Sequence, residues 1–266
     1  MKKCATPKIM GIVNVTPDSF YDGGHYSCVH KAIDHIKRII DDGVDIIDIG
    51  GASSRPGAEP VSIEEELRRI IPVIEAAAKF FNGPISVDTT WSVVARAACE
   101  AGAAWINDIS AGRFDSNVID VVAETGCKII LMHSRGTPQT MQTNPDYEDV
   151  VGEVVEELTA SVNKFKAGGV ADRQILIDPG IGFAKSFDHN IALMKNLACI
   201  VALGYPVVIG TSRKSFIGTI TGKSVQERLS GSLATVAAAW RSGVEIYRVH
   251  DVAETADFMR VLSVVE

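Results

Sequence analysis

Val44-Asp-Ile-Ile-Asp-Ile-Gly50 is a short run of apolar, β-branched residues, and it follows a longer segment, 29–42, in which apolar residues recur three and four positions apart. The first pattern predicts a buried strand and the second an amphipathic helix. Seven further apolar runs begin near Ile9, Pro84, Ala104, Lys128, Gln174, Pro206 and Glu245, and helical stretches such as 63–81, 147–167 and 229–242 lie between them. Alternating units of this kind predict a parallel sheet covered by helices.

Eight strand-helix units in 266 residues favour a closed (β/α)8 TIM barrel that forms a single domain over residues 1–266. The alternative is an open Rossmann-like sheet. Against it, no Gly-x-Gly-x-x-Gly follows the first run and no P-loop motif occurs in the sequence. Ser62 with Glu65, and Asp251 with Glu254, predict capping boxes at the starts of two helices.

The composition narrows the class of protein. With 46% hydrophobic and 22% charged residues the chain is typical of a globular protein with a sizeable core. A formal net charge of −7 argues against a nucleic-acid partner. No apolar run is long enough for a membrane span, and the basic start has no signal segment behind it. The 5 cysteines are scattered and form no Cys-x-x-Cys pair, so we expect a reducing, cytoplasmic location without a disulfide framework or zinc cluster.

Polar residues close all eight apolar runs, and a barrel would bring them together at one end. They are Asn14, Asp48, Asp88, Asn107 with Asp108, His133, Asp178, Ser212 with Lys214, and Arg248 with His250. Helix capping could explain some of them, and Asp48 and Asp108 are the candidates for that role. It does not explain the cations, which are unfavourable at a helix N-terminus. A pocket for a polar ligand accounts for the set better.

Eight segments, read in order from Ile9 to about Val261, resemble those of the dihydropteroate synthase family. They are MGIVNVTPDSFYDGG (10–24), DIGGASSRPG (48–57), SVDT (86–89), IND (106–108), MH (132–133), DPGIGF (178–183), SRKS (212–215) and RVHD (248–251). The resemblance implies a homodimeric TIM-barrel enzyme that joins 6-hydroxymethyl-7,8-dihydropterin pyrophosphate to p-aminobenzoate, with Mg²⁺ as cofactor.

The resemblance assigns Asp88, Asn107 and Asp178 to the edge of the pterin ring, with Lys214 donating to the ring from the other side. A pterin edge carries several donors beside a carbonyl, which carboxylates, an amide and an ammonium group can satisfy. Two alternatives are plainer: Asp178 could be a turn residue before Pro179, and Lys214 a solvated loop lysine.

Pyrophosphate suits arginine forks, hydroxyl groups and a divalent ion. By resemblance Arg248, His250 and Ser54 contact it, and Asn14 contacts both the pyrophosphate and its Mg²⁺. His250 alone could be an ordinary packed histidine, and His133 is interpreted as a structural residue near the pocket.

Two loops, 16–24 and 52–59, are expected to close over the site and exclude water. The resemblance places Asp22 beside the cationic pterin and gives Phe20, Pro56, Phe183 and Ser215 the p-aminobenzoate slot. Arg55 and Arg213 are candidate partners for the benzoate carboxylate, with solvated loop charges as the alternative. Because the aromatic amine is a weak nucleophile, the pyrophosphate is expected to leave first, with Asp22, Lys214, Arg248 and His250 as catalytic residues.

The sequence departs from the family at Ala52 and Ser54, where Glu and Thr are common, and at Ala184, where Gly is common. Three other functions stay open: a methyltetrahydrofolate-dependent corrinoid methyltransferase, a non-catalytic pterin-binding paralogue, and an aldolase with Lys214 as its Schiff-base lysine.

Overall fold

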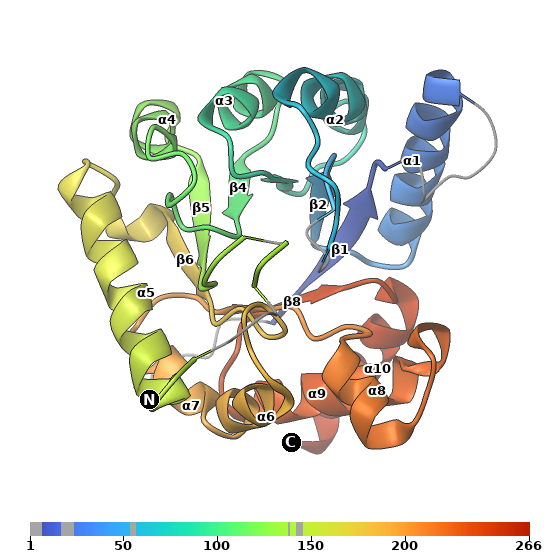
Figure 1. Ribbon diagram of the computed structural model, residues 1–266. Helices are drawn as coiled ribbons and strands as arrows, with labels where there is room; N and C mark the ends of the chain where they lie inside the picture. Colours follow the sequence, from blue (N-terminus) through green and yellow to red (C-terminus); the bar gives the residue numbers. More distant parts are fainter. Residues whose placement is uncertain (1–6, 17–23, 54–56, 138, 142–145) are drawn as a thin grey trace.

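The computed structural model describes residues 7–16, 24–53, 57–137, 139–141 and 146–266. Eight parallel strands form its centre and helices surround them (Figure 1). The strands are β1 (Lys8–Asn14), β2 (Ile46–Gly50), β3 (Ile85–Asp88), β4 (Trp105–Asp108), β5 (Lys128–Met132), β6 (Ile175–Asp178), β7 (Val208–Ile209) and β8 (Ile246–Val249). Each begins within two residues of its predicted start.

The strands follow one another around the sheet in the order β6-β5-β4-β3-β2-β1-β8-β7. A parallel bridge between Ile177 of β6 and Val207, directly before β7, joins the two ends. The backbone N–H of Ile177 also donates to the Pro206 carbonyl at 3.0 Å. The predicted closed barrel is therefore confirmed, and the open sheet is wrong.

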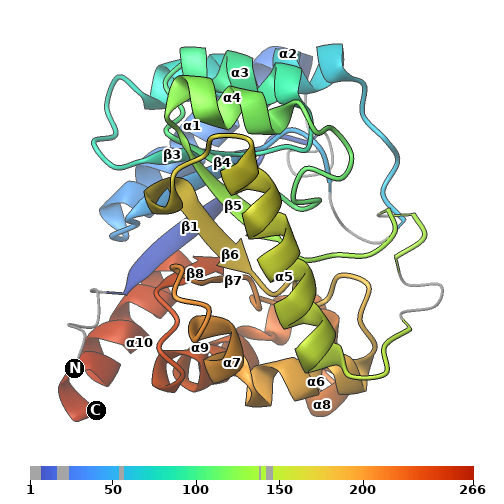
Figure 2. The same cartoon turned by 90° about the vertical axis from the view of Figure 1, so that its left-hand side faces the viewer.

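Helices cover the outside of the barrel (Figure 2). They are α1 (Gly24–Asp41), α2 (Ile63–Ala77), α3 (Ser92–Glu100), α4 (Val118–Thr125), α5 (Val150–Ala167), α6 (Phe187–Lys195), α7 (Leu197–Val201), α8 (Ser215–Thr221), α9 (Leu229–Arg241) and α10 (Val252–Val265). Within the described ranges, none of these helices has both the length and the hydrophobicity needed to cross a membrane.

The two predicted capping boxes form only in part. The Ser62 hydroxyl accepts the Glu65 N–H at 3.2 Å, but the Glu65 carboxylate binds Arg68 and Arg69 and does not return to the helix start. Asp251 precedes α10 without capping it through its side chain. Its carboxylate forms an ion pair with Arg213, so the second predicted box is wrong.

Alternation along the strands separates two buried layers. Residues that point outward pack against the helices, and those that point inward form a cluster in the barrel: Met10, Ile46, Trp105, Ile130, Leu176, Val208 and Ile246. Successive side chains of a strand face opposite sides, so the residue two positions later also points inward. These later residues include Asp48, Asn107, Met132, Asp178, Gly210 and Arg248. The same alternation therefore builds an apolar floor and a polar layer above it.

Candidate active site

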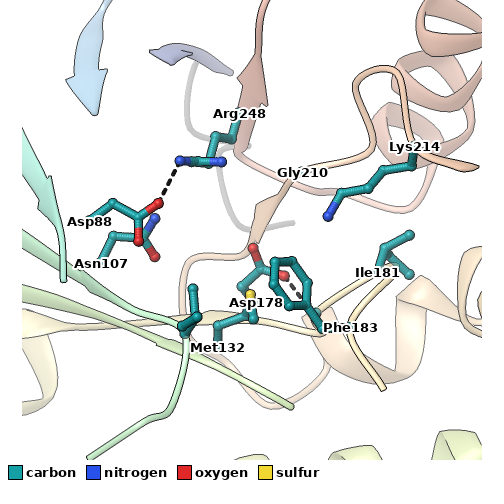
Figure 3. A pocket seen from close by; sticks show the side chains of 11 residues that line it. Asp88, Asn107, Met132, Asp178, Ile181, Phe183, Gly210, Lys214 and Arg248 are labelled. Carbon is teal, nitrogen blue, oxygen red and sulfur yellow. Dashed lines mark hydrogen bonds and ion pairs between the residues drawn. The ribbon is translucent and has the colours of Figure 1, made fainter. Parts of the chain in front are cut away.

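A small cavity opens at the carboxyl ends of the strands. It is lined by Asp88, Asn107, Ile109, Met132, Asp178, Gly180, Ile181, Phe183, Gly210, Lys214 and Arg248. In Figure 3, Lys214 reaches in from the side opposite Asp88 and Asn107, and Asp178 lies between them. The predicted meeting of Asp88, Asn107, Asp178, Lys214 and Arg248 around one cavity is confirmed.

Arg248 is held between two carboxylates. Its Nε lies 2.6 Å from Asp48 Oδ2. Its Nη2 lies 2.8 Å from Asp88 Oδ2 (Figure 3). Asn107 Nδ2 donates to the same Asp48 oxygen at 3.2 Å. Asp48 is fully buried, and its carboxylate fixes the positions of two cavity side chains, Arg248 and Asn107. The interpretation of Asp48 as a helix cap is therefore wrong, and the signal that could have found it is its inward position two residues after Ile46.

Asp108 has a different role. Its Oδ1 accepts the Ser110 N–H and hydroxyl, and its Oδ2 accepts the Gly112 N–H, each at 2.7 Å. These bonds hold the turn after β4, well before α4 begins. The capping interpretation of Asp108 is wrong for the helix, although the side chain does satisfy backbone N–H groups.

Burial changes the protonation of the cavity groups. It raises the pKa of Asp88 to about 7, against the opposing effect of Arg248, which favours the carboxylate. It lowers the pKa of Lys214 to about 8, against the attraction of Asp178. Burial also raises the pKa of Asp178, whose charged form is favoured by the Gly180 N–H and by Lys214. The site therefore holds groups that change charge close to neutral pH.

Lys214 lies against the loop between β6 and α6. Its Nζ is 4.1 Å from the centroid of the Phe183 ring, a cation-π contact. A Cβ atom on Gly182, which has φ +83°, would lie 3.0 Å from Lys214 Cδ. Lys214 is thus a cavity residue, and the solvated-loop alternative is wrong.

The same loop starts with a tight turn. Asp178 Oδ1 accepts the Gly180 N–H at 2.7 Å, so the residue both shapes the turn and lines the cavity. Gly180 has φ +68°, and a Cβ there would lie 1.8 Å from the His133 carbonyl oxygen. Ala184 has φ +47°, a left-handed conformation that costs an L-residue about 1–2 kcal/mol. This explains the usual glycine there and gives the departure at Ala184 a physical cost.

The other predicted site residues are placed as follows. Asn14 ends β1 and His250 follows β8, the neighbouring strand, with His250 Nδ1 3.0 Å from the Ser212 hydroxyl. Neither lines the cavity, and Ser215 is exposed at the start of α8. The predictions for Phe20, Asp22, Ser54, Arg55 and Pro56 lie outside the described residues.

Comparison with known proteins identifies the family. A protein-family model described as pterin binding enzyme matches residues 10–250 of the sequence. The chain belongs to the pterin-binding enzyme family. It is 47% identical over 254 residues to the dihydropteroate synthase of Synechocystis sp., covering 95% of this chain and 88% of that one. It is 45% identical over 256 residues to the dihydropteroate synthase of Escherichia coli, covering 96% of this chain and 90% of that one.

Solved structures agree with this assignment to the pterin-binding enzyme family. Dihydropteroate synthase of Xanthomonas albilineans with 4-aminobenzoic acid superposes with a TM-score of 0.93 at 44% identity, covering 98% of this chain and 94% of that one. The same enzyme in complex with 7,8-dihydropteroate superposes with a TM-score of 0.90 at 42% sequence identity, covering 99% of this chain and 95% of that one. The predicted resemblance to dihydropteroate synthases, which are transferases, is confirmed.

Proposed function

We propose that this protein is a dihydropteroate synthase, which condenses 6-hydroxymethyl-7,8-dihydropterin pyrophosphate with p-aminobenzoate to give 7,8-dihydropteroate and pyrophosphate. The observation that carries the proposal is the cavity in which Asp88, Asn107 and Asp178 face Lys214. Its relatives of 42–47% identity include enzymes of this name solved with 4-aminobenzoic acid and with 7,8-dihydropteroate.

Ring recognition follows from hydrogen-bond polarity. Asp48 accepts a hydrogen bond from Asn107 Nδ2, which fixes the amide so that its Oδ1 can accept from a ligand. Carboxylates at Asp88 and Asp178 add acceptors for the donor-rich pterin edge, and Lys214 supplies a donor for the ring carbonyl. A ligand that pairs with all four offsets the cost of their burial.

Occupation of Asp88 by the pterin also affects Arg248. Arg248 Nη2 binds Asp88 while Nε binds Asp48. Pterin donors replace this Nη2 at Asp88, and the freed end of the guanidinium turns to the departing pyrophosphate, with Asp48 still holding Nε. Arg248 and His250 then neutralise the leaving group, and the two cavity carboxylates stabilise the pterin cation. The amine of p-aminobenzoate attacks that cation and loses its proton after the new bond forms.

Asn14 is the residue that would hold Mg²⁺ at the end of the barrel. Asn14 ends β1 with a half-buried amide, an oxygen ligand of the kind Mg²⁺ takes, and β8 with His250 is its neighbour. Because Mg²⁺ commonly binds through one or two protein oxygens together with phosphate oxygens, Asn14 would hold it against the pyrophosphate. When bound, the ion would add to the neutralisation of the leaving group.

Removal of the metal tests this assignment. Excess chelator should reduce dihydropteroate formation by more than about tenfold, since the ion supplies part of the charge stabilisation of the leaving group. Added Mg²⁺ should restore turnover, and binding of a pterin without pyrophosphate should not change. Full product formation in chelator would contradict the role of the metal.

One assay tests the function itself. The protein is incubated with the pterin pyrophosphate, p-aminobenzoate and Mg²⁺, and dihydropteroate is sought by mass spectrometry. Binding of the pterin without product would instead support a non-catalytic paralogue. The predicted homodimer is tested separately by sedimentation of the purified protein.

The pH dependence of kcat/KM for the pterin substrate should be bell-shaped. Burial holds the pKa of Asp88 at about 7, so its carboxylate forms, and turnover rises, as the pH passes that value. Burial holds the pKa of Lys214 at about 8, so its ammonium is lost, and turnover falls, above that value. Asp88→Asn should remove the acid limb of the curve. An unchanged rate from about pH 6 to 9 would contradict both assignments.

A further inference from the structure

Lys185 is a buried lysine outside the cavity lining. It ends the loop that begins at Asp178, and it is only 3% exposed. Its Nζ donates to the Phe183 carbonyl at 3.0 Å and lies 2.9 Å from Nδ1 of His133. Burial of an ammonium group costs several kcal/mol, and the two hydrogen bonds of Lys185 offset part of that cost.

His133 continues this contact toward the surface. Its Nε2 lies 3.0 Å from Oε2 of Glu157 on α5. Burial lowers the pKa of Lys185 to about 7. Its ammonium form can only donate, so Nδ1 accepts from it, and the ring is then neutral with its proton on Nε2, pointing to Glu157. Burial of His133 lowers its pKa to about 4, in agreement with a neutral ring. The hydrogen bond from His133 lowers the pKa of Glu157 to about 2, which keeps it a carboxylate.

The Glu157 end of this series of hydrogen bonds is held in place by Arg135. Arg135 Nε donates to Glu157 Oε1 at 3.0 Å, and its Nη2 lies 2.6 Å from Glu153 Oε2. At the other end, the His133 N–H donates to the Asp178 carbonyl at 2.9 Å, which ties the ends of β5 and β6 together. Lys185 therefore links the cavity loop to a fixed point on α5.

The loop needs such a link. Ala184, directly before Lys185, has φ +47°, a conformation that persists only when surrounding contacts hold it. The carbonyl that Lys185 binds belongs to Phe183, whose ring lies 4.1 Å from Lys214 Nζ on the cavity wall. A loop released at Lys185 would lose this alignment of Phe183 with Lys214.

We propose that Lys185 is a positioning residue, which acts with His133 and Glu157 to hold loop 178–185 so that Phe183 and Lys214 form one wall of the p-aminobenzoate slot. The inference rests on the proposed function. It assigns the three residues to the second substrate through Phe183, whereas the acceptors for the pterin edge, Asp88, Asn107 and Asp178, lie at strand ends.

The test separates the two substrates. Lys185→Met removes the ammonium, and Glu157→Gln removes the anionic partner of His133 at a site whose side chain is 42% exposed and therefore tolerant of change. Glu156→Gln is the matched control, since it makes the same charge change one residue earlier at an exposed position on α5. For each protein, kcat, the KM for p-aminobenzoate and the Kd for the pterin pyrophosphate are measured.

Lys185→Met should raise the KM for p-aminobenzoate about 10- to 100-fold, as expected when hydrogen bonds to a charged group are lost. Glu157→Gln should raise it about three- to tenfold, and Glu156→Gln should leave it unchanged. The Kd for the pterin pyrophosphate should stay within about twofold in all three variants. A general loss of structure would instead weaken the binding of both substrates together.

Two results would overturn the proposal: an unchanged KM for p-aminobenzoate in both Lys185→Met and Glu157→Gln, or an equal weakening of pterin binding. If Lys185→Met does not fold, Glu157→Gln against Glu156→Gln decides alone. Absence of dihydropteroate from the wild-type protein would reject the proposed function, whereas product from the wild type with unaltered variants would reject only the role of Lys185.

Discussion

Lys214→Ala should lower kcat/KM by about 10²- to 10³-fold, the loss expected when one preorganised donor is removed from an active site. The side chain enters the cavity opposite Asp88 and Asn107 and contacts the Phe183 ring. With the proposed function, its loss should therefore weaken interactions with both the pterin and p-aminobenzoate. Steady-state kinetics with each substrate varied in turn measures the effect.

Stability should not fall with activity in this variant. Burial disfavours the charged form of Lys214, as its lowered pKa of about 8 indicates, so removal of the ammonium relieves a cost in the folded state. The melting temperature should therefore equal or exceed that of the wild type. Lys223→Ala, at an exposed lysine shortly after α8, is the control and should keep full activity. Activity of Lys214→Ala near the control value would remove Lys214 from the site.

The sequence predicts the barrel because the pattern that indicates it is local and is repeated eight times. Each strand is an apolar run bounded by a helical stretch, and a polar residue follows at each strand end. Strand alternation then places Asn107, Asp178 and Arg248 on the inner face without any knowledge of the helices. Fold and cavity could therefore be predicted from the pattern together with the resemblance.

What the sequence could not predict is which charged groups pair with one another. Asp48 and Arg248 are 200 residues apart in the chain, and nothing in either segment indicates their contact. Asp251 has the spacing of a helix cap, yet its carboxylate pairs with Arg213, because an ion pair between the segments after β7 and β8, two neighbouring strands, competes with the local bond. The burial of Lys185 could not be predicted either, since it depends on His133, which follows β5.

The pair of Asp48 and Arg248 also affects stability. The Arg248 side chain is only 19% exposed and lies against the fully buried Asp48. Arg248→Met should abolish turnover and also lower the free energy of unfolding by about 3–5 kcal/mol, the cost of leaving a buried charge without its partner. Urea denaturation and kcat/KM measure the two effects.

A double variant distinguishes the two roles of Arg248. Only one oxygen of Asp48 binds Arg248 and Asn107, and its Oδ1 has no hydrogen-bond partner in the part of the chain that the structure describes, so the carboxylate depends strongly on the guanidinium. Arg248→Met combined with Asp48→Asn removes both charges, which should restore most of the lost stability without restoring turnover. Recovery of activity in the double variant would show that Arg248 serves only to neutralise Asp48. A double variant no more stable than Arg248→Met would show that the buried charge was not the cause of the loss.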